Sequence, residues 1–325
     1  EISLGLVGSE MCIRDSTYRF LVNPKKEFSI KGTYSGVSEM EYEAKGTLEG
    51  GTAKMYTIED KSKINHTLQV GDYFCADGKI VSVDAETVPE NVIGIVCYVG
   101  NSQPSVTHPE LYSAEIDALR RDFPACTHGI VLSTKNSLVK DDEQNDIALQ
   151  MFHSSKAGYY SDWFNSDEDW KDKFVGCNTE RDVNKNDASK VFPALMGYNN
   201  TKILTMCYEG MGSISTCDYV YDYIMAYRKA EAVPSGVTPW YLPSVMCWDQ
   251  VAKNMSGINS SLQKVNGDKM VTSDLPVNNK AAGHYWSSTQ RSAVNQWTHS
   301  MGNGSFHVTC ERASCAGYFR MMLAF

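Results

Sequence analysis

The stretch from His284 to Phe325 alternates between apolar runs and a polar middle. Its first run, residues 285–289, and its last run, residues 318–325, are rich in aromatic and apolar side chains and predict two buried strands. Because side chains alternate along a strand, one face of the last run carries Phe319, Met321, Leu323 and Phe325. The opposite face is nearly as apolar, as expected of a strand that is covered on both sides.

The polar middle of this stretch, Gln290 to Glu311, consists mainly of Gln, Ser, Asn, Thr, His and Gly, with a few large apolar residues between them. We expect it to loop out at the surface, because a mostly polar segment between two core strands cannot itself be core. Small polar groups around occasional aromatic anchors suit a binding face. An ordinary solvated loop has the same composition, so both interpretations stay open.

The N-terminal part of the chain has a different character. Residues 1–16 resemble the translation of a sequencing-adapter fragment and lack the continuous apolar core of a signal peptide. We therefore expect a non-native leader there, with the native N-terminus missing. Short runs at 18–22, 28–30 and 40–44, separated by glycines, predict strands of a partial β domain or stalk over residues 17–68.

A larger unit is predicted over residues 69–325. In its first half, apolar runs predict strands at residues 69–75, 80–83, 91–99 and 127–133. An Asp-Gly turn signal lies between the first two and predicts a hairpin. Apolar residues near helical spacing predict helices at 112–121 and 214–232, a helix from Ser244 through Trp248, Val251 and Ala252, and a short helix at 258–265. A polar, acidic stretch over 140–186 is expected to be an insertion. The pattern predicts an α+β fold with a mixed, mainly antiparallel sheet and flanking helices, preceded by the small β segment.

Three tyrosines in one predicted helix could either pack in the core or form a ligand platform. Tyr219, Tyr223 and Tyr227 are spaced four residues apart and fall on one face of the helix predicted over 214–232. Such a stripe is more often core packing than a ligand platform, and we expect core packing.

Composition and charge exclude some classes of partner. The chain is 42% apolar and 21% charged, with a formal net charge of −9. This acidity argues against nucleic acid as a partner and against a basic membrane-surface patch. No apolar run is long enough to span a bilayer directly. Of ten cysteines, Cys12 belongs to the suspected leader. The remaining odd number predicts no particular disulfide framework, and Cys97, inside an apolar run, is expected to be a small buried residue.

A set of aromatic motifs carries a family resemblance. The runs Trp240-Tyr-Leu-Pro-Ser244, Tyr285-Trp-Ser-Ser-Thr289 and Arg320-Met-Met-Leu-Ala-Phe325 resemble the C-type-lectin-fold variable proteins of diversity-generating retroelements. Gly71-Asp-Tyr73, Ile93-Gly-Ile95 and Cys126-Thr-His-Gly129 resemble the opening of the same module. The resemblance covers residues 69–325 and implies a C-type-lectin-like ligand-binding domain with a variable region at 285–325.

The resemblance also implies roles for individual residues. A fixed scaffold would include Tyr285, Trp286, Trp297, Phe306, Phe319 and Arg320. Positions that vary in the family would form the ligand-binding surface, and here they are Gln290, Arg291, Ser292, Ala293, Val294, Gln296, Thr298, His299, Asn303, Ser305, His307, Thr309, Glu311, Arg312 and Ser314. A scaffold tolerates arbitrary side chains only where they point into solvent, so we expect this set to be exposed.

Other chemistry could use the same residues. His299, His307, Cys310 and Cys315 could supply four zinc ligands, although the spacing lacks a paired C-x2-C. Cys310 and Cys315 also resemble the active-site pair of formylglycine-generating enzymes, but here the pair lies next to the last strand. Calcium-dependent sugar binding is not indicated, because Glu311 is the only acidic residue after His284. We therefore predict no metal, no cofactor and no enzymatic activity.

Three hypotheses follow. The first is a ligand-binding display protein, of receptor or adhesin type, whose variable surface touches a protein or surface ligand. The second is a structural or tip subunit of a surface appendage without hypervariation. The third is an oxidase that uses Cys310 and Cys315. The first two predict a location on the cell surface, outside the cell or on a phage particle.

Overall fold

The structure is a computed structural model and describes residues 23–35, 39–52, 64, 66–136, 149–151, 172–175, 194–211, 218–270, 284–292, 295–301, 307–312 and 316–325. The chain divides into two compact units, Glu1–Glu59 and Asp60–Phe325. The suspected leader, the predicted strand at 18–22 and most of the predicted insertion lie outside the described residues.

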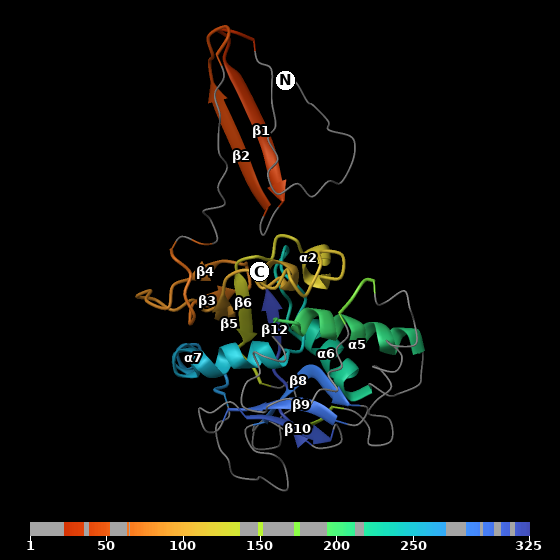
Figure 1. The fold of residues 1–325 in the computed structure, drawn as a ribbon. Coiled ribbons are helices and arrows are strands. Elements are labelled where there is room, and N and C mark those ends of the chain that lie inside the picture. Colours follow the sequence, from red (N-terminus) through yellow and green to blue (C-terminus); the bar gives the residue numbers. More distant parts are fainter. Residues whose placement is uncertain are drawn as a thin grey trace. The chain divides into compact units, whose positions relative to one another are not determined.

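In the first unit, β1 (Phe28–Ser35) and β2 (Glu39–Gly46) form an antiparallel pair, as predicted from the runs at 28–30 and 40–44 (Figure 1). Ser29 lies opposite Lys45, and Lys31 lies opposite Glu43. The Ser29 hydroxyl donates a hydrogen bond to the Glu43 carboxylate at 3.0 Å. Because these four positions share one face, that face of the hairpin is polar.

The second unit is built on a five-stranded sheet with the order β12-β6-β5-β3-β4, antiparallel throughout. The strands are β3 (Tyr73–Cys75), β4 (Ile80–Val81), β5 (Val92–Val99), β6 (Gly129–Ser133) and β12 (Met322–Ala324). The first and last strands of the unit are therefore in one sheet. The predicted strands and the hairpin between β3 and β4 are confirmed, although β3, β4 and β12 are shorter than the runs that predicted them.

Three long helices accompany this sheet: α5 (Gly197–Met211), α6 (Asp218–Ala230) and α7 (Val245–Lys264). Two short ones, α1 (Pro104–Thr107) and α2 (Ala118–Asp122), lie between β5 and β6 in the chain. Helix α7 packs against β5 and also against β8 and β9, and in Figure 1 it lies between the two sheets. Its buried residues include Trp248, Val251 and Ile258.

The second sheet has three antiparallel strands in the order β10-β9-β8. They are β8 (His284–Ser292), β9 (Asn295–Ser300) and β10 (His307–Arg312). A further pair joins β7 (Leu149–Gln150) to β11 (Ala316–Gly317). The expectation that residues 290–311 form a surface loop is therefore wrong, since β9 and β10 come from that stretch. Antiparallel pairing uses backbone groups, so a polar sequence can form a ladder when its neighbours are strands.

Several helix predictions need correction. The helix predicted over 112–121 begins only at Ala118 and ends at Asp122; the Asp117 carboxylate accepts the Arg120 N–H at 2.9 Å and caps this later start. The helices predicted from Ser244 and at 258–265 are one helix, α7, which continues through Gly257. Helix α5 was not predicted, since its buried face includes the polar residues Asn199, Asn200 and Thr201.

The tyrosine stripe of α6 packs in the core where the structure describes it. Tyr223 and Tyr227 are buried. The Tyr223 ring stacks on Phe319 with centroids 4.7 Å apart, and Tyr227 meets Trp240 edge to face at 5.7 Å. The side chain of Tyr219 lies outside the described residues. Core packing is therefore confirmed for these two tyrosines, and the coarse prediction of a mainly antiparallel α+β fold is confirmed as well.

Candidate functional site

Four of the predicted binding-surface residues are buried. Gln290, Gln296 and Thr298 are each 1% exposed, and His299 is fully buried. The expectation that these side chains point into solvent is therefore wrong. Gln296, Thr298 and His299 lie in β9, which is paired on both sides by β8 and β10, and Gln290 lies in β8; α7 packs against both strands.

Polar side chains in this sheet donate hydrogen bonds to backbone carbonyls near them. The Gln296 amide donates to the Ser287 carbonyl at 2.8 Å, and the Ser287 hydroxyl donates to the Trp297 carbonyl at 2.8 Å. The Trp248 indole N–H, from α7, donates to the Trp286 carbonyl at 2.9 Å. Each bond satisfies a buried polar group that would otherwise be costly, so these side chains have a structural role.

The remaining predicted positions are only partly described. The backbones of His307, Thr309, Glu311 and Arg312 lie in β10, opposite Ser300, Thr298, Gln296 and Asn295 of β9. Arg291 and Ser292 belong to β8. The residues Ala293, Val294, Asn303, Ser305, Phe306 and Ser314 lie outside the described residues. A ligand-binding role for the positions that are not buried stays a prediction.

The expected scaffold residues lie in the core where they are described. Tyr285, Trp286, Trp297, Phe319 and Arg320 are all buried. Trp248 and Tyr285 have ring centroids 5.0 Å apart, which joins α7 to β8. Aromatic contacts of this kind fix the sheet against the helix layer.

The metal and thiol alternatives can be compared with the described part of the chain. No group of three or more His, Cys, Asp or Glu that could hold a metal ion occurs among the described residues. Cys315 and the side chains of His307 and Cys310 lie outside them. The described residues therefore do not test these two alternatives, and the lack of a metal site and of enzymatic activity stays a prediction.

The side chains of five cysteines are described, namely Cys75, Cys97, Cys126, Cys207 and Cys247, and all five are buried. Burial raises the pKa of the Cys75 thiol to about 11 and that of Cys126 to about 12. Burial also raises the pKa of Cys97 and Cys247. Since the thiolate is the reactive form, these groups are inert at neutral pH. Cys97 is 1% exposed, which confirms the prediction of a small buried residue.

A polar network that we did not predict surrounds Arg320. Its guanidinium donates to the Ser133 carbonyl at 2.7 and 2.9 Å, and to the Asn136 side-chain oxygen and the Asp268 carbonyl, each at 2.7 Å. The Tyr285 hydroxyl donates to the same Asn136 oxygen at 3.1 Å. The network joins the end of β6, the segment after α7, β8 and the approach to β12.

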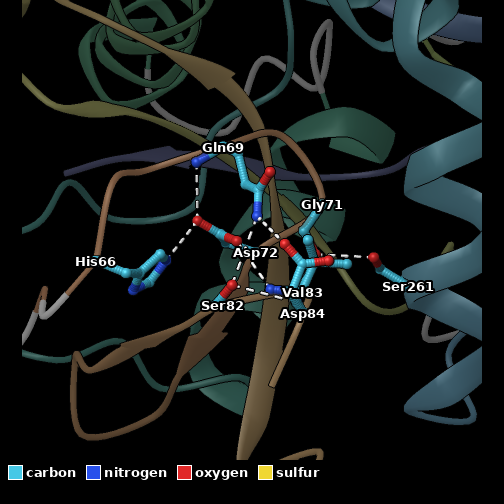
Figure 2. A network of polar contacts seen from close by, with 8 residues as sticks. All are labelled: His66, Gln69, Gly71, Asp72, Ser82, Val83, Asp84 and Ser261. Atoms are coloured by element: carbon cyan, nitrogen blue, oxygen red, sulfur yellow. Dashed lines mark hydrogen bonds and ion pairs between the residues drawn. The ribbon is translucent and has the colours of Figure 1, made fainter. Parts of the chain in front are cut away.

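A second unpredicted network surrounds Asp72, which is fully buried (Figure 2). One carboxylate oxygen, Oδ2, contacts His66 Nε2 at 2.8 Å and accepts the backbone N–H of Gln69 at 2.9 Å. The other, Oδ1, accepts the backbone N–H of Val83 at 2.9 Å. Both oxygens are thus occupied by protein groups, which suits anchoring rather than proton transfer. Two of the partners, His66 and Gln69, are near Asp72 in the sequence, but nothing local indicates Val83, because it lies beyond the hairpin turn.

Comparison with known proteins identifies the relatives of this fold. No family model matches the chain. It is 31% identical over 296 residues to the Bacteroides ovatus protein Fim1C, which is named as a fimbrium tip subunit. The match covers 89% of this chain and 51% of Fim1C, so the chain spans about half the length of this curated relative.

A solved structure points in the same direction. The crystal structure of a fimbrial protein from Bacteroides ovatus superposes with a TM-score of 0.62 at 26% identity, over 93% of this chain and 58% of that one. The chain is similar to fimbrial proteins. Its two units thus resemble part of a longer fimbrial protein.

These comparisons correct the sequence-based resemblance. The relatives are fimbrial proteins, so the identification as a variable protein of a diversity-generating retroelement is wrong. The C-type-lectin-like fold is not confirmed beyond the coarser α+β description. The motifs that carried the resemblance include Trp240 and Trp286, which are fully or almost fully buried. Aromatic residues of this kind stabilise many α+β cores and do not by themselves identify a family.

Proposed function

We propose that the chain is part of a structural or tip subunit of a fimbrium-like surface appendage, which is the second of the three hypotheses above. The single observation that carries this proposal is the 31% identity to a protein named as a fimbrium tip subunit, over 89% of the chain. The similar crystal structure of a fimbrial protein supports it. The role is structural or adhesive rather than catalytic, and the location is the cell surface.

The structure of the second unit is consistent with such a role. Its core combines a five-stranded sheet with a second sheet across α7. Polar side chains in the core bond to backbone groups: Arg320 donates to the Ser133 carbonyl, 187 positions away in the chain, and Asp72 accepts the Val83 N–H across the β3–β4 hairpin. Within the described residues, no helix is both long and apolar enough to cross a membrane.

The proposal can be tested on cells that carry the gene. Surface appendages are sheared off, purified and labelled with an antibody raised against the chain, and then examined by electron microscopy. We expect gold label on the filaments. Label confined to filament ends identifies a tip subunit, whereas label along the shaft identifies a structural subunit.

A deletion strain serves as the control for the label. The deletion strain should lose the label and regain it when the gene is supplied in trans. The proposal fails if the chain is recovered only from the cell interior while appendages are abundant and unlabelled.

A further inference from the structure

The first segment of the second unit is fixed by one buried carboxylate. Residues 66–72 precede β3, and Asp72 is fully buried just before that strand. Its side chain receives backbone N–H bonds from Gln69 and from Val83, which lie on either side of the β3–β4 hairpin. His66 completes the set at 2.8 Å (Figure 2). We refer to His66, Gln69, Gly71, Asp72, Val83 and Ser261 as the Asp72 clamp.

The clamp also reaches the central strand and the long helix. The Gly71 N–H donates to the Val96 carbonyl at 2.8 Å, and the Val96 N–H donates to the Asp72 carbonyl at 2.9 Å. The Ser261 hydroxyl, from α7, donates to the Gly71 carbonyl at 2.8 Å. Gly71 and Asp72 are thus hydrogen-bonded to β5, to α7 and to Val83, which lies just after the hairpin.

Glycine is required at the centre of this arrangement. Gly71 has a φ of +104°, a conformation that other residues rarely adopt. A Cβ there would lie 3.3 Å from the Ser261 hydroxyl oxygen and 3.5 Å from Val83 Cγ2. The local sequence Gly71-Asp72 therefore permits both the turn of the backbone and the close approach of α7.

The hairpin that the clamp holds is weak on its own. Strands β3 and β4 are three and two residues long, and their ladder consists of Tyr73 opposite Val81 and Phe74 opposite Ile80. Strand β4 is also at the edge of the five-stranded sheet. A pair this short has little stability of its own, so the hairpin depends on the clamp, on the pairing of β3 with β5 and on the burial of Tyr73, Phe74 and Ile80.

We propose that the Asp72 clamp makes residues 66–84 open only together with the core of the five-stranded sheet. A pulling force on the preceding part of the chain is then transmitted to the whole five-stranded sheet. It does not separate the β3–β4 hairpin from the edge of that sheet. The role in bearing tension rests on the proposed function, because neighbouring subunits of an appendage pull on one another. Cooperative opening is a property of this chain alone.

Native-state amide hydrogen exchange of the full chain, followed at single residues, tests this proposal. In the unsubstituted protein, the amides of Gln69, Gly71 and Val83 should exchange as slowly as those of Val131 and Leu132 in β6. In Asp72→Asn, exchange at Gln69 and Val83 should accelerate by about 10- to 100-fold, the equivalent of about one hydrogen bond to a charged group. Exchange in β6 should accelerate only by the loss of global stability that urea denaturation of the same variant measures, and therefore by less than exchange at Gln69 and Val83.

A matched control uses the second carboxylate of the same network. Asp84 is exposed and accepts only the Gln69 side-chain amide, at 2.9 Å, among the contacts drawn in Figure 2. Asp84→Asn should leave the exchange of Gln69 and Val83 within about threefold of the unsubstituted protein. His66→Ala removes one contact at the rim of the clamp and should accelerate the same two amides by a smaller factor. This second variant supplies the test if Asp72→Asn does not fold.

Two outcomes would overturn the proposal. One is rapid exchange at Gln69 and Val83 in the unsubstituted protein while β6 stays protected. The other is equal acceleration of the clamp and of β6 in the folded variants, which would mark a general loss of stability. Either result leaves the appendage assignment standing. Absence of the chain from purified appendages removes the role in tension but does not change the exchange result.

Discussion

Gly317 lies directly against the indole ring of Trp286. A Cβ at position 317 would come within 2.8 Å of the indole nitrogen and 3.0 Å of Cε2. Trp286 is fully buried, and its neighbour Trp248 hydrogen-bonds to its carbonyl. The ring therefore has little room to move, and the absence of a side chain at 317 is part of the packing of β11 on β8.

Gly317→Ala should destabilise the protein by about 1–3 kcal/mol, because the added methyl group overpacks a rigid core. Chemical denaturation at pH 7 measures the free energy of unfolding. Gly257→Ala is the matched control, since nothing lies within 4 Å of a Cβ there and the residue is inside α7. The control should stabilise by about 0.5–1 kcal/mol through helix propensity. Equal stability of the two variants would contradict the packing described here.

Arg320→Met should destabilise by about 3–5 kcal/mol, because it removes the buried guanidinium that donates to the acceptors at Ser133, Asn136 and Asp268. Lys253→Met removes a cation whose side chain is 61% exposed, and it should cost less than about 1 kcal/mol. Thermal unfolding followed by circular dichroism compares the two. A small effect of Arg320→Met would show that the network is dispensable.

Thr298→Lys tests the burial of β9. The buried position should reject a charged side chain at a cost of about 3 kcal/mol or more, or should prevent folding. Ser260→Lys places the same side chain at an exposed position of α7 and should be within about 0.5 kcal/mol of the unsubstituted protein. Soluble yield and the denaturation midpoint are the readouts. If Thr298→Lys is as stable as the control, position 298 faces solvent.

The buried thiols predict a loss of stability in alkaline solution. Burial raises the pKa of Cys126 from 9.0 to about 12, so between these values the unfolded chain loses a proton that the folded chain keeps. The stabilisation is therefore complete below pH 9 and declines as the pH rises toward 12. For each pH unit inside this window, the free energy of unfolding falls by about 1.4 kcal/mol per group.

Urea denaturation at pH 8 and pH 10 measures this decline. Cys126→Ala should lose about 1 kcal/mol less than the unsubstituted protein between the two pH values, because it lacks one titrating group. Several buried tyrosines also have a raised pKa and contribute at higher pH, so the comparison stays at or below pH 10. Identical pH dependence of the two proteins would show that the thiol at position 126 does not titrate in this range.

Sequence patterns predicted the central sheet well and the second sheet poorly. The runs around Ile95 and Val131 are apolar on both faces, and buried strands of that kind are predicted from sequence alone. The strand that contains Gln296 and Thr298 is polar, and its burial depends on neighbours that lie far away in the chain. Helix α5 was missed for the same reason: it has polar residues on its buried face in place of an apolar stripe. One of them, Asn199, donates a hydrogen bond to the Val175 carbonyl.

The networks at Asp72 and Arg320 show the same limit. Ser261 reaches the Gly71 carbonyl across 190 positions of the chain, and Arg320 reaches Ser133 across 187. No local pattern in the sequence encodes such distant partners. The appendage role could be named only as one of three hypotheses, because a structural subunit carries no catalytic motif. Similarity to fimbrial proteins was needed to choose among them.

The strand order β12-β6-β5-β3-β4 has a consequence for synthesis of the chain. Strand β6 pairs on one side with β5, which is made shortly before it, and on the other side with Met322–Ala324. A nascent chain that has passed Ser133 therefore carries an unpaired β6 edge until almost two hundred further residues have been added. An exposed strand edge favours pairing with other chains, so a chain stopped before Met322 should aggregate rather than refold.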